Sequence, residues 1–84
     1  MEAINLNPGE FVHFSWKDSS YEAGWKYGQA RSGGIVHVQS VGAVVESTDE
    51  CLTITSAIDR EGGGAMCPLS VPWGVITELD RINQ

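Results

Sequence analysis

Positive charge is scarce in this chain of 84 residues. Five lysines and arginines stand against eleven aspartates and glutamates, which gives a net charge of −6. Nucleic-acid binding depends mainly on neutralising phosphates, so this balance disfavours it, and it disfavours anionic membrane surfaces for the same reason. The same net charge favours solubility.

Cysteine and long apolar runs are scarce as well. The chain has two cysteines, Cys51 and Cys67, whereas a small secreted domain stabilised by disulfides usually has more. No basic residues followed by an apolar stretch open the chain, and uncharged stretches such as Ser32 to Val45 are too short to span a bilayer. We therefore expect a cytoplasmic protein with two free thiols and no membrane contact.

Apolar residues and glycine, in contrast, are plentiful. Apolar residues make up 42% of the chain, charged residues only 19%, and ten residues are glycine. This composition is typical of a globular protein, and with many Val, Ile and Thr it favours short strands and tight turns over helices. The length allows one domain, which we place over residues 1–84.

Apolar alternation predicts five short strands. In the first, over residues 11–16, Val12, Phe14 and Trp16 share one face, so Trp16 is expected in the core. The second, over residues 35–46, contains Gly42, and a lone glycine within a strand indicates a bend or bulge. The other three are expected at residues 52–58, 69–71 and 75–79, with a flexible glycine loop at residues 62–64.

Five short strands with these turns predict a small SH3-like barrel, because closing the sheet hides backbone edges. The alternative is a five-stranded OB-type barrel. That fold usually places a helix before its fourth strand, where this chain is rich in glycine.

The stretch from Val41 to Ile82 resembles the Sm-like fold in the order of its features. These are a glycine in a bent second strand, an acidic turn, an aliphatic strand, a following acidic residue and two short strands around a tight turn: Gly42, Asp49, Leu52, Ile54, Asp59, Val71, Gly74 and Val75. The front half, with PGEFVHFSWKDSSYEAGW, looks like small Sm-like proteins of tailed phages, including cyanophages. The resemblance implies an all-β, five-stranded barrel of Sm-like type, with a strongly bent second strand and an irregular, aromatic-rich loop after the first.

The resemblance also implies a homo-oligomeric ring, a pentamer to a heptamer, in which the fourth strand of one subunit pairs with the fifth strand of its neighbour. The residues expected at that interface are Leu69, Val71, Val75, Ile76 and Thr77. Pro72 lacks an N–H group, so we expect it at the end of its strand.

Two departures from the Sm-like pattern bear on RNA binding. Cys51 stands where an RNA-binding Sm protein carries the asparagine that contacts the base. Pro72 and Trp73 stand where such proteins carry an Arg-Gly pair. The inner RNA site of the family is therefore not carried over to this chain.

The aromatic residues are unevenly distributed, because six of the seven lie between Phe11 and Tyr27. Rings beside cations are typical of single-stranded nucleic-acid platforms. Segment 16–31 is therefore an alternative RNA-binding or partner surface, with Lys17, Tyr21, Trp25, Lys26, Tyr27 and Arg31 as its candidates. The competing interpretation is that these rings cover one end of the barrel or pack between subunits.

No pattern indicates a metal, a cofactor or catalysis. His13, His37, Cys51 and Cys67 lack the paired spacing of zinc sites, and the glycine run is not followed by the residues of a phosphate loop. The acidic residues flanking the third strand indicate a solvated rim. We expect a non-enzymatic interaction or assembly module of phage origin, with itself and another phage or host protein as partners.

Overall fold

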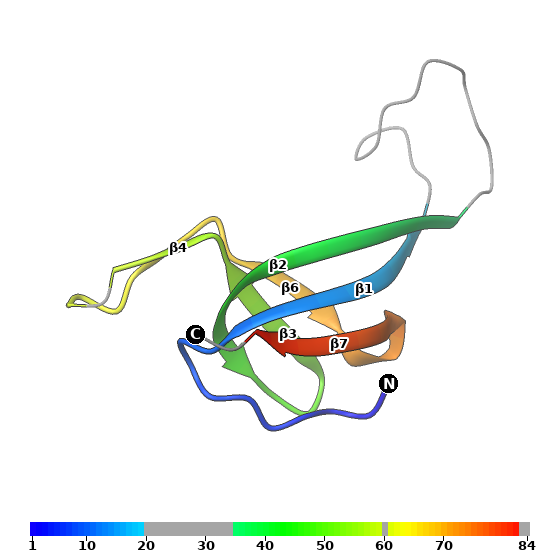
Figure 1. The fold of residues 1–84 in the computed structure, drawn as a ribbon, viewed down its shortest axis with the longest axis horizontal. Coiled ribbons are helices and arrows are strands. Elements are labelled where there is room, and N and C mark those ends of the chain that lie inside the picture. Colours follow the sequence, from blue (N-terminus) through cyan, green and yellow to red (C-terminus); the bar gives the residue numbers. More distant parts are fainter. Residues whose placement is uncertain (20–34, 60, 83–84) are drawn as a thin grey trace, which may run out of the picture.

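The described part of the chain is an all-β domain, as the sequence predicts (Figure 1). The computed structural model describes residues 1–19, 35–59 and 61–82. Within them the elements are β1 (Phe11–Ser19), β2 (Ile35–Ser47), β3 (Cys51–Thr55), β4 (Ala57–Ile58), β5 (Ala65–Met66), β6 (Leu69–Pro72), the 3-10 helix η1 (Trp73–Val75) and β7 (Ile76–Ile82).

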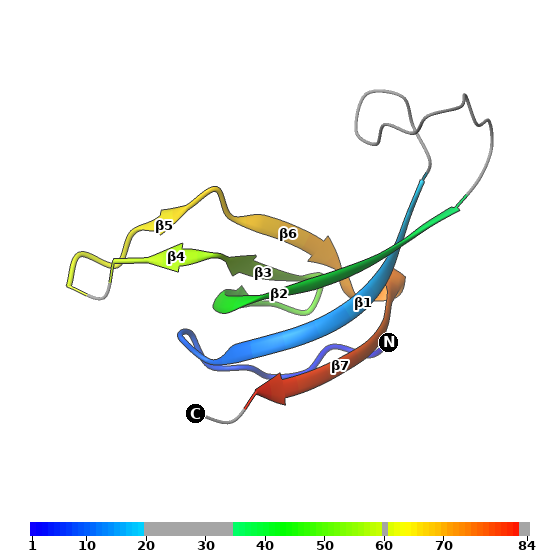
Figure 2. The same ribbon diagram turned by 45° about the horizontal axis from the view of Figure 1, so that its top comes forward.

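Five strands form one antiparallel sheet in the order β6-β3-β2-β1-β7. The central strand is β2, and β1 lies between β2 and the edge strand β7, so that Phe14 pairs with Ser40 on one side and with Leu79 on the other. Strands β4 and β5 form a separate two-stranded ribbon that projects from the body of the domain (Figure 2).

The sheet is curved but not closed, which differs from the predicted barrel. Strands β6 and β7 are its two edges, and in the described residues they do not pair with each other. The chain passes from β6 to β7 through η1, and Met1 lies against η1 by donating hydrogen bonds to the oxygens of Trp73 and Ile76. The opening between the edges is thus bridged by a turn and by the N-terminus rather than by a strand ladder.

Strand β2 bends over to meet β3 (Figure 1), and Gly42 directly precedes Ala43, where the pairing with β3 begins. Up to Gly42 the strand pairs with β1, and from Ala43 it also pairs with β3, beginning at Thr55. A Cβ atom at Gly42 would lie 2.7 Å from the main-chain oxygen of Thr55, which is closer than such atoms approach. Glycine at this position is what allows β3 to cross so near. A register shift between Val44 and Glu46 adds to the curvature.

The core lies on the concave side of the sheet. Val12 and Phe14 are fully buried, as the alternation in β1 predicts. Burying such side chains stabilises a fold by about 1.5–3 kcal/mol each. The buried cluster draws on the N-terminal segment, η1 and all five strands of the sheet: Leu6, Val12, Phe14, Val44, Leu52, Ile54, Val71, Trp73 and Ile76.

One tryptophan differs from its expected position, and another is buried without having been predicted so. Trp16, expected in the core, is half-buried at its margin, and its Nε1 donates to Ser40 Oγ at 3.0 Å. Trp73, whose burial the sequence did not indicate, lies in the turn η1 and is only 3% exposed. The physical reason is that β1 and β2 extend beyond the packed part of the sheet at Trp16, whereas η1 turns Trp73 inward.

The N-terminal segment, residues 1–9, runs along the opening of the sheet. Leu6 is buried in the core, and Ile4 packs against it. Ser47 Oγ donates to the main-chain oxygen of Ile4 at 2.7 Å, which fastens the segment to the end of β2.

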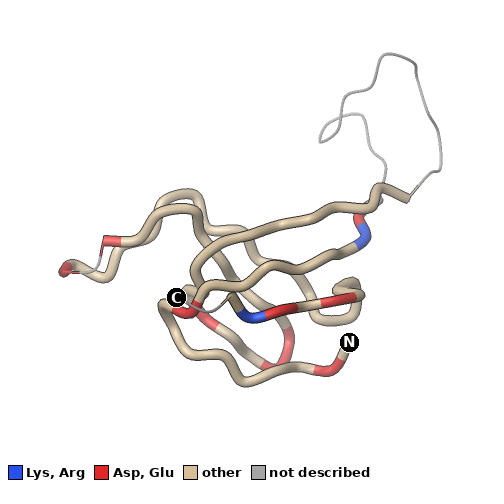
Figure 3. The backbone as a smooth tube through the Cα atoms, viewed as in Figure 1, with Lys and Arg blue, Asp and Glu red and all other residues tan. Residues whose placement is uncertain are grey.

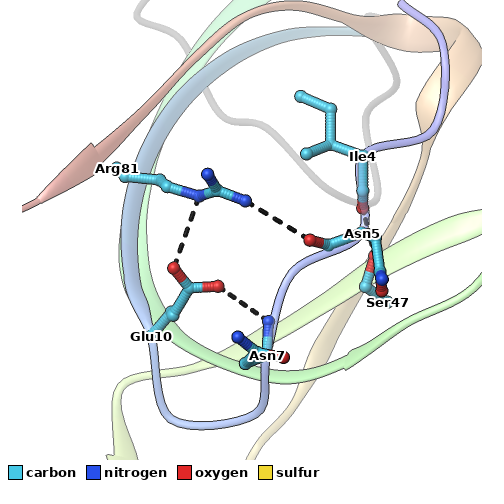
Figure 4. Close-up of polar contacts among 6 residues, drawn as sticks. All are labelled: Ile4, Asn5, Asn7, Glu10, Ser47 and Arg81. Carbon is cyan, nitrogen blue, oxygen red and sulfur yellow. Dashed lines mark hydrogen bonds and ion pairs between the residues drawn. The ribbon is translucent and has the colours of Figure 1, made fainter.

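A polar cluster fastens the same segment to β7 (Figure 4). The carboxylate of Glu10 accepts a hydrogen bond from the Asn7 N–H at 2.7 Å and pairs with Arg81 at 3.3 Å. Arg81 also donates to the main-chain oxygen of Asn5. Because the Arg81 side chain is 53% exposed, this ion pair contributes at most about 1 kcal/mol.

Candidate functional site

The two edges of the sheet, β6 and β7, are the main candidate for an interaction site. An edge strand presents a row of unpaired N–H and C=O groups, which is a template for pairing with another strand. Among the described residues no strand pairs with the outer side of β6 or β7, although Met1 donates to the oxygen of Ile76 at the start of β7.

Hydrogen bonding shows which groups of β6 point outward. The Trp73 N–H donates to the oxygen of Glu50, next to β3. Since backbone groups alternate along a strand, Leu69 and Val71 bond to β3, whereas Ser70 and Pro72 face the outer edge. Pro72 therefore ends β6 with its ring nitrogen directed away from the ladder, so no ladder bond is lost.

The same alternation applies to β7. The Val44 N–H donates to the oxygen of Glu10, which orients the even-numbered residues of β1 toward β2 and the odd-numbered ones toward β7. Asp80 and Ile82, opposite His13 and Phe11, thus bond to β1. Leu79 and Arg81 direct their backbone groups to the outer edge.

The residues predicted for the oligomer interface fall into two groups. Leu69, at 40% exposure, and Thr77 are exposed, and Val75 is half-buried. Val71 and Ile76 belong to the core, with exposures of 1% and 2%. Their side chains are therefore not available to a neighbouring copy.

The segment Thr48–Cys51, here called the acidic turn, lies against η1. The Trp73 side chain is buried, and its Nε1 donates a hydrogen bond to the main-chain oxygen of Thr48 at 2.8 Å. Asp49 and Glu50 are exposed on this turn, and Cys51 behind them is half-buried. Figure 3 shows acidic residues here, on β7 and at the tip of the β4–β5 ribbon. Exposed carboxylates on the acidic turn disfavour a phosphate at this turn.

The aromatic segment proposed as a nucleic-acid or partner surface is described only at its start. Lys17 is exposed and pairs with His37 across the β1–β2 hairpin. The remaining candidates lie outside the described residues: Tyr21, Trp25, Lys26, Tyr27 and Arg31.

The residues weighed as metal ligands are separated in space. His13 pairs with Val41 and His37 with Lys17, so the two histidines lie on different rungs of the hairpin. Cys51 is on β3, and the exposed Cys67 follows β5 with a positive φ of 46°. Across residues 1–19, 35–59 and 61–82, no group of three or more His, Cys, Asp or Glu side chains could hold a metal ion.

A shallow hollow of about 440 Å³ lies between the Pro8–Gly9 turn, β2 and the β4–β5 ribbon. Its lining is mostly backbone and small aliphatic side chains, with Asp59 as the charged group. Among the described residues of this lining, neither a nucleophile nor a cation accompanies Asp59.

Comparison of the chain with protein-family models, curated proteins and solved structures gives no match. Within the described residues, no helix has the length and apolar character needed to cross a membrane.

Proposed function

We propose that the chain is a non-enzymatic Sm-like protein of the tailed-phage type. Its copies form a ring by pairing β6 of one subunit with β7 of the next, and the ring serves as an interaction or assembly module. The observation that carries this proposal is the strand order, because the fourth and fifth strands of the sheet along the chain are its two edges.

The two edges are suited to each other in their backbone groups. The outer side of β6 offers the N–H and C=O of Ser70 and the C=O of Pro72. The outer side of β7 offers the N–H and C=O of Leu79 and Arg81. Because the two surfaces differ, the contact is head-to-tail, and such contacts form closed rings when the rotation between copies closes.

The acidic turn supports assembly over RNA binding at this end of the domain. Asp49 and Glu50 place carboxylates where a nucleic-acid site needs cations. The buried indole of Trp73 has no free face for a base to stack on. RNA or single-stranded nucleic-acid binding through segment 16–31 stays the alternative function.

The ring contact is tested by Ser70→Pro, with Ser70→Ala as the matched control. Both variants lose the hydrogen bond between Ser70 Oγ and Thr53 Oγ1, but only proline removes the outward N–H. Light scattering should find a wild-type particle much heavier than the 9.1 kDa chain. Ser70→Pro should lower the particle mass roughly five- to sevenfold, and Ser70→Ala should leave it unchanged.

An unchanged mass in a folded Ser70→Pro protein would exclude β6 as a ring contact. The alternative function has a separate test, which is fluorescence titration with short RNA oligomers at low and moderate salt. Tight, salt-sensitive quenching of tryptophan would favour RNA binding over a purely structural module.

A further inference from the structure

A third unpaired edge, besides β6 and β7, lies on the first half of β2. Strand β3 pairs with β2 only from Ala43 to Ser47, whereas β1 pairs with it from Ile35 onward. In the described residues, no strand lies along the other side of residues 35–41. Figure 2 shows this part of the β1–β2 hairpin extending away from the rest of the sheet. We call the outer side of Ile35–Val41 the β2 edge.

The unpaired groups on the β2 edge belong to alternate residues. Both the N–H and the C=O of Val44 bond toward β1, to Glu10 and Gly9. With a regular register down to Ile35, the even-numbered residues of β2 share that direction. The odd-numbered residues direct their N–H and C=O groups outward: Ile35, His37, Gln39 and Val41.

The side chains on this edge match a second copy of the same edge. Ile35 and Val41 are exposed by 60% and 61%, which is unusual for large aliphatic residues in a strand. When two β2 edges meet antiparallel about a two-fold axis, Ile35 of one copy can lie opposite Val41 of the other. His37 then lies opposite Gln39, and each odd-numbered residue meets an odd-numbered residue. Every outward N–H and C=O group finds a partner, and both exposed aliphatics are covered.

Charge is compatible with this contact. Residues 35–41 contain no aspartate, glutamate, lysine or arginine, although the whole chain carries a net charge of −6. Two copies can therefore approach along this edge without charged side chains of the edge facing each other. Uncharged, β-branched edge strands without proline or glycine are those that pair with other chains most readily.

We propose that the β2 edge is a two-fold contact between copies of this chain, formed by antiparallel pairing of Ile35–Val41 with itself. This contact uses neither β6 nor β7, so it is independent of the proposed ring contact. Where both contacts form, the β2 edge joins subunits of two rings.

Gln39→Pro tests the contact, with Gln39→Thr as the matched control. Proline at position 39 removes an outward N–H and leaves the ladder to β1 intact, whereas threonine keeps the N–H and suits a strand. By light scattering, Gln39→Pro should lower the particle mass about twofold, and Gln39→Thr should leave it at the wild-type value. Equal masses for folded Gln39→Pro and wild type would overturn the proposal.

Hydrogen exchange of the wild-type protein, followed by NMR, keeps the proposal testable should Gln39→Pro fail to fold. The amides of His37, Gln39 and Val41 should be protected at high protein concentration and exchange faster on dilution. The amides of Val36, Val38 and Ser40, which bond to β1, serve as internal controls. Rapid exchange of the odd-numbered amides at every concentration would refute the contact. Protection that does not change on dilution would also refute it, because the edge would then be covered within one chain.

The particle masses of the Ser70→Pro and Gln39→Pro variants distinguish the β2 contact from the ring contact. Ser70→Pro acts on β6 and should leave a particle of two chains joined through the β2 edge. A failure of Ser70→Pro to change the mass contradicts the ring alone, and a failure of Gln39→Pro contradicts the β2 contact alone.

Discussion

Gly42 is the residue on which the path of β2 depends most directly. Its missing side chain allows the main-chain oxygen of Thr55 to approach, and any larger residue must push β3 away. Gly74 in η1 is a suitable comparison, because no atom lies within 4 Å of an added Cβ there.

Gly42→Ala should therefore lower the free energy of unfolding by about 1–3 kcal/mol, as overpacking does. Gly74→Ala should change it by less than about 0.5 kcal/mol. Urea denaturation at one protein concentration measures both, provided that the m-value stays constant. Equal effects of the two substitutions would show that the close approach of β3 is not limiting.

Trp73 should contribute more to the stability of the core than Trp16 does. The Trp73 side chain is buried, and both its indole N–H and its backbone N–H bond to the acidic turn. Trp73→Ala should lower the free energy of unfolding by about 3–5 kcal/mol, as large aromatic truncations in cores do. Trp16→Ala should lower it by less, and a larger loss at Trp16 in the same urea titration would contradict this ranking.

The N-terminal segment acts as an element of the fold although it forms no strand. Leu6 fills the core at the opening between the sheet edges, and hydrogen bonds from Ser47 and Arg81 hold the flanking backbone. The segment thereby covers apolar side chains that an open sheet would otherwise expose to water.

Leu6→Ala should lower the free energy of unfolding by about 2–5 kcal/mol, as for other leucines truncated in cores. Glu2→Ala, at an exposed position of the same segment, is the matched control and should have little effect. Chemical denaturation distinguishes the two. Identical midpoints would mean that the segment does not contribute to stability.

How far each element could be predicted depended on its length. Alternation over Phe11–Trp16 predicts β1 because a period of two is visible over six residues. The β4–β5 ribbon has strands of two residues, which are too short to show a period of their own. The sequence therefore predicted Ala57–Ile58 as the end of one strand over residues 52–58, and it did not predict β5. Ile4 and Leu6 are two apolar residues within a polar segment, and their burial is decided by distant partners on β2 and β7.

The candidate site was predictable only in outline. The positions of β6 and β7 follow from short aliphatic runs on either side of a turn. The burial of Trp73 goes instead with bonds to Glu50 and Thr48, more than 20 residues away along the chain. Such long-range pairing cannot be read from local spacing.

At the scale of the whole molecule, the two proposed contacts lie on different edges and should act independently. The double variant Ser70→Pro/Gln39→Pro lacks an outward N–H on both edges, so it should be a monomer of 9.1 kDa in light scattering. The Ser70→Ala/Gln39→Thr protein serves as the control and should match the wild-type mass. A folded double variant heavier than one chain would reveal a third surface of association.

The outward ring nitrogen of Pro72 has a kinetic consequence. When two β6 edges collide, the carbonyl oxygens around Pro72 meet no donor, and the Ser70 N–H alone can form bonds. Such an encounter should separate quickly, because a poorly bonded complex has a high dissociation rate. Growing assemblies would then lose wrongly joined copies faster than they add correct ones, and few chains would be trapped in unproductive aggregates.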